Sequence, residues 1–440
     1  IKNFDNEIIY FKKKKYFPHY STKESYHLFK KVINKINKNK LLKKKLFING
    51  YNIISIALED FFWQYCFQFT KYKYFIKKHG TSLNTEKVND KNYLINGYQR
   101  VKYYVNGDEN FLNFFKSTSK YIAFIFWFSY SFIFNKNKIW IDKSFLKNLR
   151  YKNFIIKNKS KYLVIPFAFE SHKTRSKNIE DAFIKDAKKK IGQYKKWIFA
   201  IKYLYPKKIL LSDNAYNNFS ILLAAKIMGT KCEAICHSVN IKYHMNTMGT
   251  DIIQNKNLLL YDKIYVYNDD FKDFVIKNGS FYKSKKIGVV GWINDKSYNF
   301  GIKKNYSNKY LLYAFEHFCN YHKINKFLKF FHKKNHKILI KKRPDMENYG
   351  HFDKDLNIEF VDDFTKSQIK DSICALGSTT SLLFNLSQNY IPIVYIKNDG
   401  LNNFNGFNYP KNWVVVDNIN NSIYKKISNL FINKKYRLDR

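Results

Sequence analysis

Short apolar runs alternate with amphipathic segments from about residue 160 to the C-terminus. Near-continuous apolar runs are typical of strands in parallel sheets, which helices cover on both faces. In a first series we expect strands at 161–169, 207–213, 230–238, 261–269 and 285–292. The intervening segments 179–205, 217–229 and 270–279 have the pattern of helices, and glycines close the last two.

A second series of the same kind follows. Strands are expected at 309–318, 337–344, 357–364, 371–378, 391–397 and 412–418, with helices at 324–335 and 379–389 and a closing helix after 418. The stretch 293–308 is polar and weakly periodic, so we expect a linker there. The pattern predicts an α/β protein with two tandem Rossmann-like, doubly wound domains, 1–292 and 309–440. We also expect the closing helix to pack back on the N-terminal domain.

The N-terminal part of the chain is less regular. Residues 1–45 form a basic segment, either helical or a loose arm, and 47–70 predict a short apolar element leading into an aromatic helix. The run YIAFIFWFSYSFIF at 121–134 falls short of the ~20 residues that a spanning helix needs. We expect a buried helix there, with a membrane-docking helix at the lipid interface as the alternative.

Composition supports a globular protein of two domains. The chain has 440 residues, of which 45% are hydrophobic and 19% aromatic, and this excludes wholesale disorder. Its net charge of +45 is carried almost entirely by lysine, because only six residues (100, 150, 175, 343, 437 and 440) are arginine. Nucleic-acid binding surfaces favour arginine, whose planar fork binds phosphates and bases in a bidentate manner.

The charge therefore does not predict a nucleic-acid partner. Abundant Lys, Asn, Ile, Phe and Tyr are typical of an A+T-rich gene, which makes solvated lysines the simplest interpretation. A lysine-rich surface is also attracted to anionic membranes and to acidic polysaccharide or diphosphate-linked acceptors. An anionic membrane surface is therefore an expected partner, and nucleic acid is not.

The cysteines indicate a reducing compartment. Five are scattered along the chain, and Cys232 and Cys236 lack the second pair that a zinc site requires. No secretory signal pattern is visible, although the sequence begins at Ile1 and leaves an upstream segment open. We expect a cytoplasmic protein, peripheral on the inner face of the cytoplasmic membrane.

The clearest candidate for chemistry follows the strand at 371–378. The strand ends at Gly377, and Ser378, Thr379, Thr380 and Ser381 open the next helix. Glycine lets an anion approach the backbone, the first turn of a helix offers unpaired N–H groups, and hydroxyls add donors. This pattern predicts a phosphate-binding turn. The alternative, in which Ser378 or Thr379 only caps the helix, remains open.

This turn, together with the strand at Ile391-Pro392-Ile393-Val394, resembles the donor-site turn of GT-B glycosyltransferases of bacterial surface polysaccharide synthesis. It is similar to bacterial sialyltransferases, Kdo transferases and CDP-glycerol glycerophosphotransferases. The resemblance covers about 205–400, through the order of elements and short motifs. It implies a cleft between an acceptor-side N-terminal domain and a C-terminal domain that binds the nucleotide sugar. It also implies no metal, and no cofactor other than the nucleotide-sugar donor as substrate.

The resemblance assigns further donor-binding residues. These families carry Lys-x-His-Pro where this chain has Lys341-Lys342-Arg343-Pro344. Arginine keeps a phosphate-binding role there, but it cannot serve as a proton donor. Glu316 follows the first strand of the second domain and would lie at the nucleotide, while Gly288 or Gly291 would open the cleft.

Three residues after first-domain strands are candidates for acceptor activation. Asp213 ends the strand 207–213, His237 stands in Cys236-His237-Ser238 where the families often have Gln-His-Gly, and Glu170 follows the strand 161–169. Transfer requires a base for the acceptor hydroxyl, or a carboxylate nucleophile if configuration is retained. Structural alternatives stay open: Asp213 as a helix cap and His237 as a buried histidine. Glu59-Asp60 is a further fallback acid pair.

The sequence predicts an enzyme that transfers a sugar from a nucleotide donor to a cell-surface glycan, such as capsule or lipopolysaccharide, or to its lipid-linked precursor. A CMP-linked donor carrying Kdo or a sialic-acid-like sugar is favoured. The alternatives are a CDP-glycerol or CDP-ribitol phosphotransferase of the same fold, an inactive scaffold, and, least favoured, a nucleic-acid-binding protein.

Overall fold

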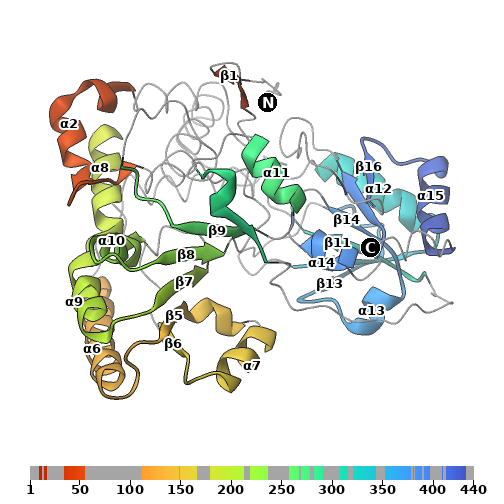
Figure 1. The fold of residues 1–440 in the computed structure, drawn as a ribbon. Helices are drawn as coiled ribbons and strands as arrows, with labels where there is room; N and C mark the ends of the chain where they lie inside the picture. The colour runs from red at the N-terminus through yellow and green to blue at the C-terminus, as the bar shows by residue number, and fades with distance from the viewer. Residues whose placement is uncertain are drawn as a thin grey trace. The chain divides into compact units, whose positions relative to one another are not determined.

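The computed structural model describes residues 9–11, 14–16, 34–54, 111–147, 149–165, 179–212, 219–235, 257–266, 269–277, 282–290, 308–315, 321–342, 352–377, 380, 382–388, 391–396, 409 and 413–432 (Figure 1). These residues divide into two compact units, an N-terminal unit up to residue 290 and a C-terminal unit from residue 308. Of the expected linker 293–308, only Asn308 is among the described residues.

A parallel six-stranded sheet forms the centre of the N-terminal unit, with strand order β10-β9-β8-β7-β5-β6. Its strands are β5 Ile139–Asp142, β6 Tyr162–Ile165, β7 Lys208–Ser212, β8 Cys232–Ile235, β9 Lys263–Val266 and β10 Ile287–Val289. All five pairs of neighbours run parallel. The five strands expected in this series are confirmed, each shorter than its apolar run. β5 was not expected, although it lies between β6 and β7 inside the sheet.

The helices of this unit are α2 Lys40–Lys45, α6 Phe111–Phe134, α7 Leu149–Lys157, α8 Ile179–Lys190, α9 Tyr194–Leu204, α10 Phe219–Ile227 and α11 Asp269–Lys277, with 3-10 turns η2 Lys143–Lys147 and η5 Ser284–Lys286. Two short antiparallel hairpins precede the sheet, β1 Ile9–Phe11 with β2 Lys14–Tyr16 and β3 Phe47–Ile48 with β4 Tyr51–Asn52. The aromatic helix expected after 54 lies outside the described residues.

The expectation of one continuous helix over 179–205 is wrong. The chain turns between α8 and α9, where the N–H of Gly192 donates to the carbonyl of Lys189 at 3.0 Å. A Cβ at position 192 would lie 3.3 Å from the same carbonyl oxygen, so the tight turn favours glycine. Periodicity did not reveal the break, because both helices bury apolar residues at helical spacing.

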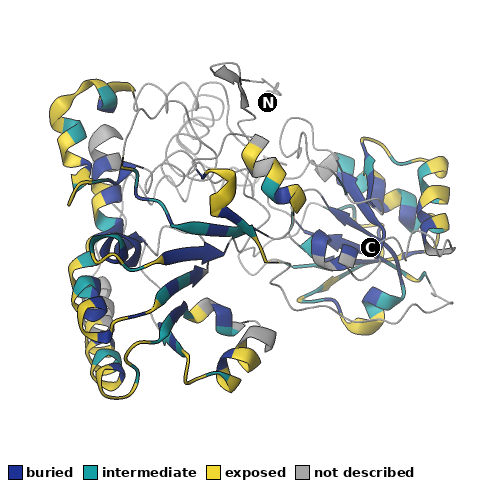
Figure 2. Ribbon diagram, in the orientation of Figure 1, coloured by how far each residue is buried: buried dark blue, intermediate teal, exposed yellow. Residues whose placement is uncertain are grey.

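The expectation that the apolar run 121–134 is buried is also wrong. It forms the second half of α6, and only one face of that half is covered. Phe124 and Ser131 are buried, while Phe126 is 72% exposed and Ile133 69% exposed. Exposed residues of this unit are coloured yellow in Figure 2. A helix that is apolar all round therefore lies on the surface of this unit.

Four aromatic rings join α6 to the sheet. Trp197 of α9 contacts Phe124 and Trp127 of α6 at ring-centroid distances of 5.4 and 5.9 Å, and Trp140 of β5 at 6.2 Å. Trp140 and Trp197 are both fully buried. Edge-on aromatic contacts of this kind add to the stabilisation from buried area.

A second parallel six-stranded sheet forms the C-terminal unit, with strand order β13-β12-β11-β14-β15-β16. Its strands are β11 Tyr310–Ala314, β12 Lys337–Lys341, β13 Ile358–Val361, β14 Ser372–Gly377, β15 Ile393–Ile396 and β16 Trp413–Val416, and its helices are α12 Tyr321–His332, α13 Lys366–Lys370, α14 Leu382–Gln388 and α15 Asn421–Ile432. Every strand expected in the second series is confirmed. The strands β14 and β15 are buried at every position, as near-continuous apolar runs predict.

The closing helix α15 packs on the core of its own unit, through Ile427 and Leu430. Buried His336 fixes it further, since its Nε2 lies 2.8 Å from the hydroxyl of Tyr424 and its Nδ1 lies 2.7 Å from the carbonyl of Asn308. Burial lowers the pKa of His336, although the contact with Asn308 acts in the other direction. The expected packing of this helix on the N-terminal domain stays a prediction.

Each unit has a sheet of parallel strands that alternate with helices along the chain. This confirms the expected fold class, an α/β protein with two Rossmann-like units. Among the helices that the structure describes, none combines the length and apolar character needed to cross a membrane.

The tryptophan cluster generates a prediction about stability. Replacing fully buried Trp197 by alanine should lower the free energy of unfolding of the N-terminal unit by about 3–5 kcal/mol, because it leaves a cavity between α6, α9 and β5. Ile156→Ala, at a position 54% exposed, should change it by less than about 0.5 kcal/mol. Urea unfolding followed by circular dichroism measures both; equal effects would contradict the packing described.

Candidate functional site

The strand order of the C-terminal sheet marks one position on its edge. Numbered along the chain, its strands lie in the order 3-2-1-4-5-6, so the direction of winding reverses between β11 and β14. Because every neighbouring pair is parallel, the carboxyl ends of these two strands meet at the same edge. Open α/β sheets bind ligands in the crevice at such a switch point. Gly377 is the last residue of β14 and lies there.

Thr380 is the described residue of the turn that follows Gly377. Its Oγ1 accepts a hydrogen bond from the N–H of Leu382 at 3.3 Å, and its carbonyl accepts one from the N–H of Leu383 at 3.2 Å. Thr380 therefore helps to cap the start of α14. Ser378, Thr379 and Ser381 lie outside the described residues, so both their phosphate-binding role and the capping alternative stay predictions.

Lys341 is the last residue of β12, next to β11 at the same edge. Its Nζ lies 2.7 Å from Oδ1 of Asp363, and Lys342 makes a similar pair with Asp362 at 3.1 Å. Both pairs are partly exposed, and exposed ion pairs contribute only about 0–1 kcal/mol. An incoming phosphate can therefore share the two lysines with these carboxylates, or displace the carboxylates from them. Glu316 follows β11 and Arg343 follows β12 in the sequence, and both lie outside the described residues.

The N-terminal sheet has its own switch point. Numbered along the chain, its strands lie in the order 2-1-3-4-5-6, so the winding reverses between β5 and β7. Asp213 comes directly after β7, His237 two residues after β8, and Glu170 five residues after β6. These three residues lie outside the described part of the chain, so the structure describes the strands that lead to them but not their mutual distances.

Sequence reasoning missed an acid at this switch point. Asp142 is the last residue of β5, half-buried, beside the end of β7. The signal was present in the sequence, because KIWID repeats the pattern of KILLSD, in which an apolar strand ends on an acid. Asp142 therefore joins Asp213, His237 and Glu170 as a candidate acid or base.

Gly288 and Gly291 were expected to open a cleft. Gly288 lies within β10 rather than after it, and a Cβ there would come within 2.7 Å of the Tyr265 ring and 2.8 Å of the Lys263 side chain. Close packing on β9 therefore favours glycine at 288, and its expected role at a cleft stays a prediction. Gly291 lies outside the described residues.

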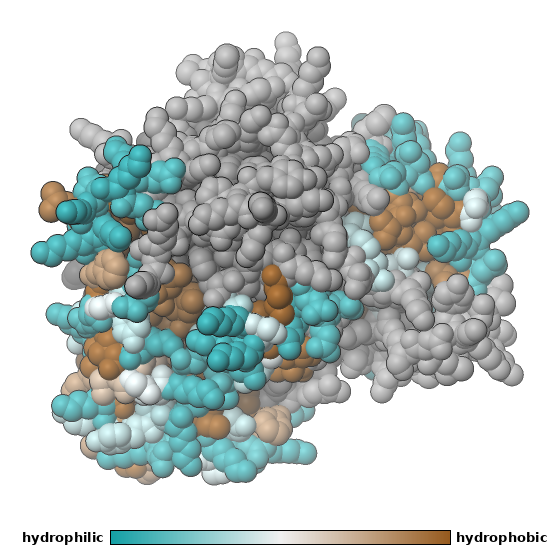
Figure 3. Space-filling view, turned by 45° about the horizontal axis from the view of Figure 1, so that its top comes forward, coloured by the Kyte–Doolittle hydropathy of each residue, from teal (hydrophilic) through white to brown (hydrophobic). Residues whose placement is uncertain are grey.

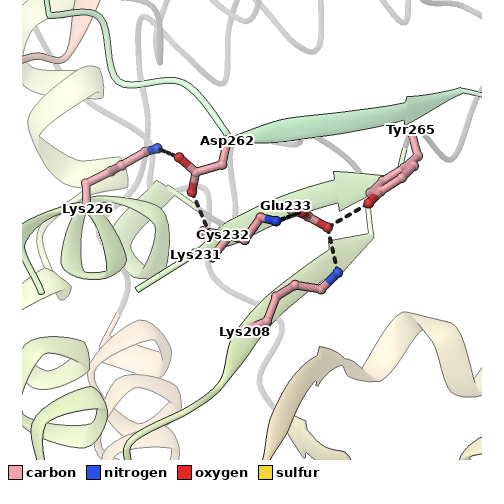
Figure 4. Close-up of polar contacts among 7 residues, drawn as sticks. All are labelled: Lys208, Lys226, Lys231, Cys232, Glu233, Asp262 and Tyr265. Carbon is pink, nitrogen blue, oxygen red and sulfur yellow. Dashed lines mark hydrogen bonds and ion pairs between the residues drawn. The ribbon is translucent and has the colours of Figure 1, made fainter. Parts of the chain in front are cut away.

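The best-defined polar cluster of the N-terminal unit lies near the amino ends of its strands (Figure 4). The carboxylate of Glu233 on β8 is almost fully buried and accepts hydrogen bonds from Lys208 of β7 at 2.7 Å and Tyr265 of β9 at 2.9 Å. Lys231 adds an ion pair at 3.2 Å. Beside it, Asp262 pairs with Lys226 and accepts a bond from the N–H of Cys232 at 2.8 Å.

The protonation states of this cluster follow from its contacts. Burial alone would raise the pKa of Glu233, but the hydrogen bonds from Lys208, Tyr265 and Lys231 outweigh it and hold the pKa below its ordinary value. Burial, followed by the bond to Glu233, raises the pKa of Tyr265 to about 12. Burial also raises the pKa of the Cys232 thiol, which makes it unreactive. The cluster holds strands together and has the features of a structural network.

Within the described residues, no three His, Cys, Asp or Glu side chains come together in a way that could hold a metal ion. Metal independence stays a prediction.

The fold and the two switch points together define a class: an α/β protein of two Rossmann-like units, the architecture of the GT-B type. No family model matches the chain, and no curated protein matches it. Solved structures with a similar fold include S. aureus MnaA with UDP (13% identity, 68% of this chain and 89% of that chain, TM-score 0.43) and the glycotransferase of kitacinnamycin (10%, 69% and 92%, 0.38). MurG from Acinetobacter baumannii is also similar (9%, 59% and 78%, 0.32). Likenesses at this level assign neither a site nor an activity to the chain.

The Glu233 network generates a pH-dependent prediction. Glu233→Gln should lower the free energy of unfolding at pH 7 by about 2 kcal/mol, because two lysines lose their buried carboxylate. The folded-state pKa is depressed, so the carboxylate stabilises the fold above its ordinary pKa of 4.5, and this contribution is lost as the pH falls through the lower folded-state value. The difference between wild type and variant should therefore shrink in acid.

The matched control is Glu359→Gln on β13, which removes the exposed pair with Lys337. Its effect should stay below about 0.5 kcal/mol at every pH. Urea unfolding at several pH values measures both variants. A gap for Glu233→Gln that does not change with pH would show that its charge contributes nothing.

Proposed function

We propose that this protein is a glycosyltransferase that moves a sugar from a nucleotide-linked donor to a cell-surface glycan or its lipid-linked precursor. The observation that carries the proposal is the position of the Gly377-Ser378-Thr379-Thr380-Ser381 turn, which follows β14 at the switch point of a sheet with the order 3-2-1-4-5-6. A turn of glycine and hydroxyl residues at that place suits the phosphates of a nucleotide.

The donor side would work by electrostatics. As the bond between the anomeric carbon and the phosphate oxygen breaks, negative charge develops on the departing phosphate. The hydroxyls of Ser378, Thr379 and Ser381 and the guanidinium of Arg343 would hold that charge, with Lys341 beside them at the end of β12. Glu316, which follows β11, would lie at the nucleotide. No divalent metal is required in this scheme.

The acceptor side would work by proton transfer. The acceptor hydroxyl oxygen forms the new bond to the anomeric carbon, and its proton passes to a base as that bond forms. Asp213 is the first choice, because it directly follows β7 at the switch point of the N-terminal sheet. His237, Glu170 and Asp142 also follow strands of that sheet and are the other candidates.

The resemblance described for the sequence favours a CMP-linked donor. Purified protein incubated separately with CMP-, UDP- and CDP-linked sugars and with CDP-glycerol should release the nucleotide of the sugar donor that it uses. Mass spectrometry of the acceptor product separates sugar transfer from glycerol-phosphate transfer. Turnover of CDP-glycerol alone would replace the proposal with the phosphotransferase, and binding of none of these donors would refute it.

Two lysines on β12 provide a matched test of donor binding. Lys341 lies at the carboxyl end and Lys337 at the amino end, and each pairs with one carboxylate. Lys341→Ala and Arg343→Ala should weaken nucleotide binding on the order of tenfold each, the scale of a charge-assisted hydrogen bond. Lys337→Ala should leave it unchanged. Calorimetric titration with the nucleotide measures all three, and equal effects of the two lysine variants would place the nucleotide elsewhere.

The base assignment has a separate kinetic test. Asp213→Asn should lower kcat by about 10²–10⁴-fold while nucleotide affinity is retained, since general-base catalysis contributes on that scale. The control is Asp270→Asn, at an exposed position in the first turn of α11, which should leave kcat unchanged. His237→Gln, Glu170→Gln and Asp142→Asn measured beside them identify the base if Asp213 is not it. Full activity in all four variants would contradict acid–base catalysis from this sheet edge.

A further inference from the structure

The exposed side of α6 and the neighbouring part of α9 carry many exposed apolar side chains. We call this surface the aromatic face; its members are Tyr121, Ile122, Ile125, Phe126, Tyr130, Phe132, Ile133 and Phe134 of α6 with Phe199 and Tyr203 of α9. Phe126, Ile133 and Phe134 are 72%, 69% and 65% exposed. Exposed apolar residues scattered singly are ordinary, whereas many of them gathered on two neighbouring helices indicate an interaction surface.

Ring contacts join the two helices into one surface. Phe128 lies 5.0 Å from Phe199, Phe132 lies 6.5 Å from Tyr203, and Phe199 lies 4.7 Å from Tyr203, all measured between ring centroids. On the covered side of α6, the Nε1 of Trp127 donates to the carbonyl of Val164 in β6 at 3.1 Å. This bond and the buried tryptophans hold the aromatic face in place on the sheet.

Lysines border the aromatic face. Lys136 Nζ lies 3.7 Å from the ring centre of Phe132, and Lys202 Nζ lies 5.7 Å from that of Tyr203. Lys195 is exposed on α9, and Lys196 Nζ lies 5.0 Å from the ring of Phe124. The sequences of α6 and α9 contain no Asp or Glu. On these two helices, exposed aromatic and aliphatic side chains are therefore combined with lysines and with no acidic residue.

We propose that the aromatic face docks on the surface of an anionic lipid bilayer, with α6 lying in the plane of the interface. Aromatic side chains insert at the boundary between headgroups and acyl chains, and lysines around them bind anionic headgroups. Figure 3 shows hydrophobic atoms interspersed with hydrophilic ones at the lower left, the part of the molecule that carries α6 and α9 in Figure 1. The helix does not cross the membrane, in keeping with its hydropathy.

A second copy of the chain fits this surface poorly. A symmetric contact through the aromatic face would bring together two surfaces that are both bordered by lysines, with no acidic residue on α6 or α9 to compensate. The net charge of +45 on each chain adds to the repulsion. An anionic bilayer has the complementary charge.

Vesicle flotation tests the proposal with the full chain. The protein should float with vesicles of phosphatidylglycerol and phosphatidylcholine, far less with phosphatidylcholine alone, and less as salt is raised. Phe126→Ser and Ile133→Ser should each weaken binding on the order of tenfold, because each removes an apolar side chain that the bilayer would bury. Lys202→Gln should weaken it several-fold.

Matched controls lie elsewhere on the surface. Leu41→Ser on α2 removes a side chain that is 75% exposed, and Lys425→Gln on α15 removes an exposed lysine; both should float as wild type does. All substituted positions are exposed, and unchanged thermal unfolding checks that the variants fold.

Three outcomes would overturn the proposal: no flotation of the wild type, equal loss in the aromatic-face and control variants, or concentration-dependent self-association that Phe126→Ser abolishes. The last would show that a second copy covers the face. The inference stands apart from the proposed function, since lipid binding requires no donor. Loss of flotation with donor binding retained would leave the glycosyltransferase proposal intact.

Discussion

Parallel pairing of strands is the constraint on which the rest of this structure depends. A parallel strand can be reached only by a crossover connection, so helices alternate with strands along both halves of the chain. The helices bury the sheets, and this is why strands such as β14 and β15 are buried at every position and almost entirely apolar. The same constraint collects all carboxyl ends of a sheet at one edge. Residues far apart in the sequence, such as Lys341 of β12 and Gly377 of β14, therefore reach the same edge of the sheet, where β11 lies between their two strands.

Most strands could be predicted from the sequence, because a strand that is buried on both faces of a parallel sheet appears as a continuous apolar run. β5 was missed for a physical reason: it is only four residues long, and so short an apolar run carries little periodic signal of its own. The turn at Gly192 and the exposed side of α6 were missed for a different reason. Hydropathy states which side chains favour burial, whereas the neighbours decide how much surface is available to bury them.

The candidate site was predictable in outline. The position of Gly377 at a strand end followed from the pattern, but its position at a switch point required the strand order, which no local signal in the sequence encodes. The ion pairs of Lys341 and Lys342 were not predictable either, since their partners Asp363 and Asp362 follow β13 and lie beside the end of β12 only because the two strands pair in the sheet. Asp142 could have been found, because its strand ends on an acid as the strand before Asp213 does.

The buried carboxylate of Glu233 has a consequence for how the N-terminal sheet assembles. A strand that is apolar on both faces carries little information about its own alignment, because a slide along its neighbour exchanges one hydrophobic contact for another. In β8, a shift by one residue would turn Glu233 to the opposite face, away from Lys208 on one side and Tyr265 on the other. A single acid among apolar residues thereby penalises such misaligned pairings with both neighbouring strands, and it favours the observed register at the centre of the sheet.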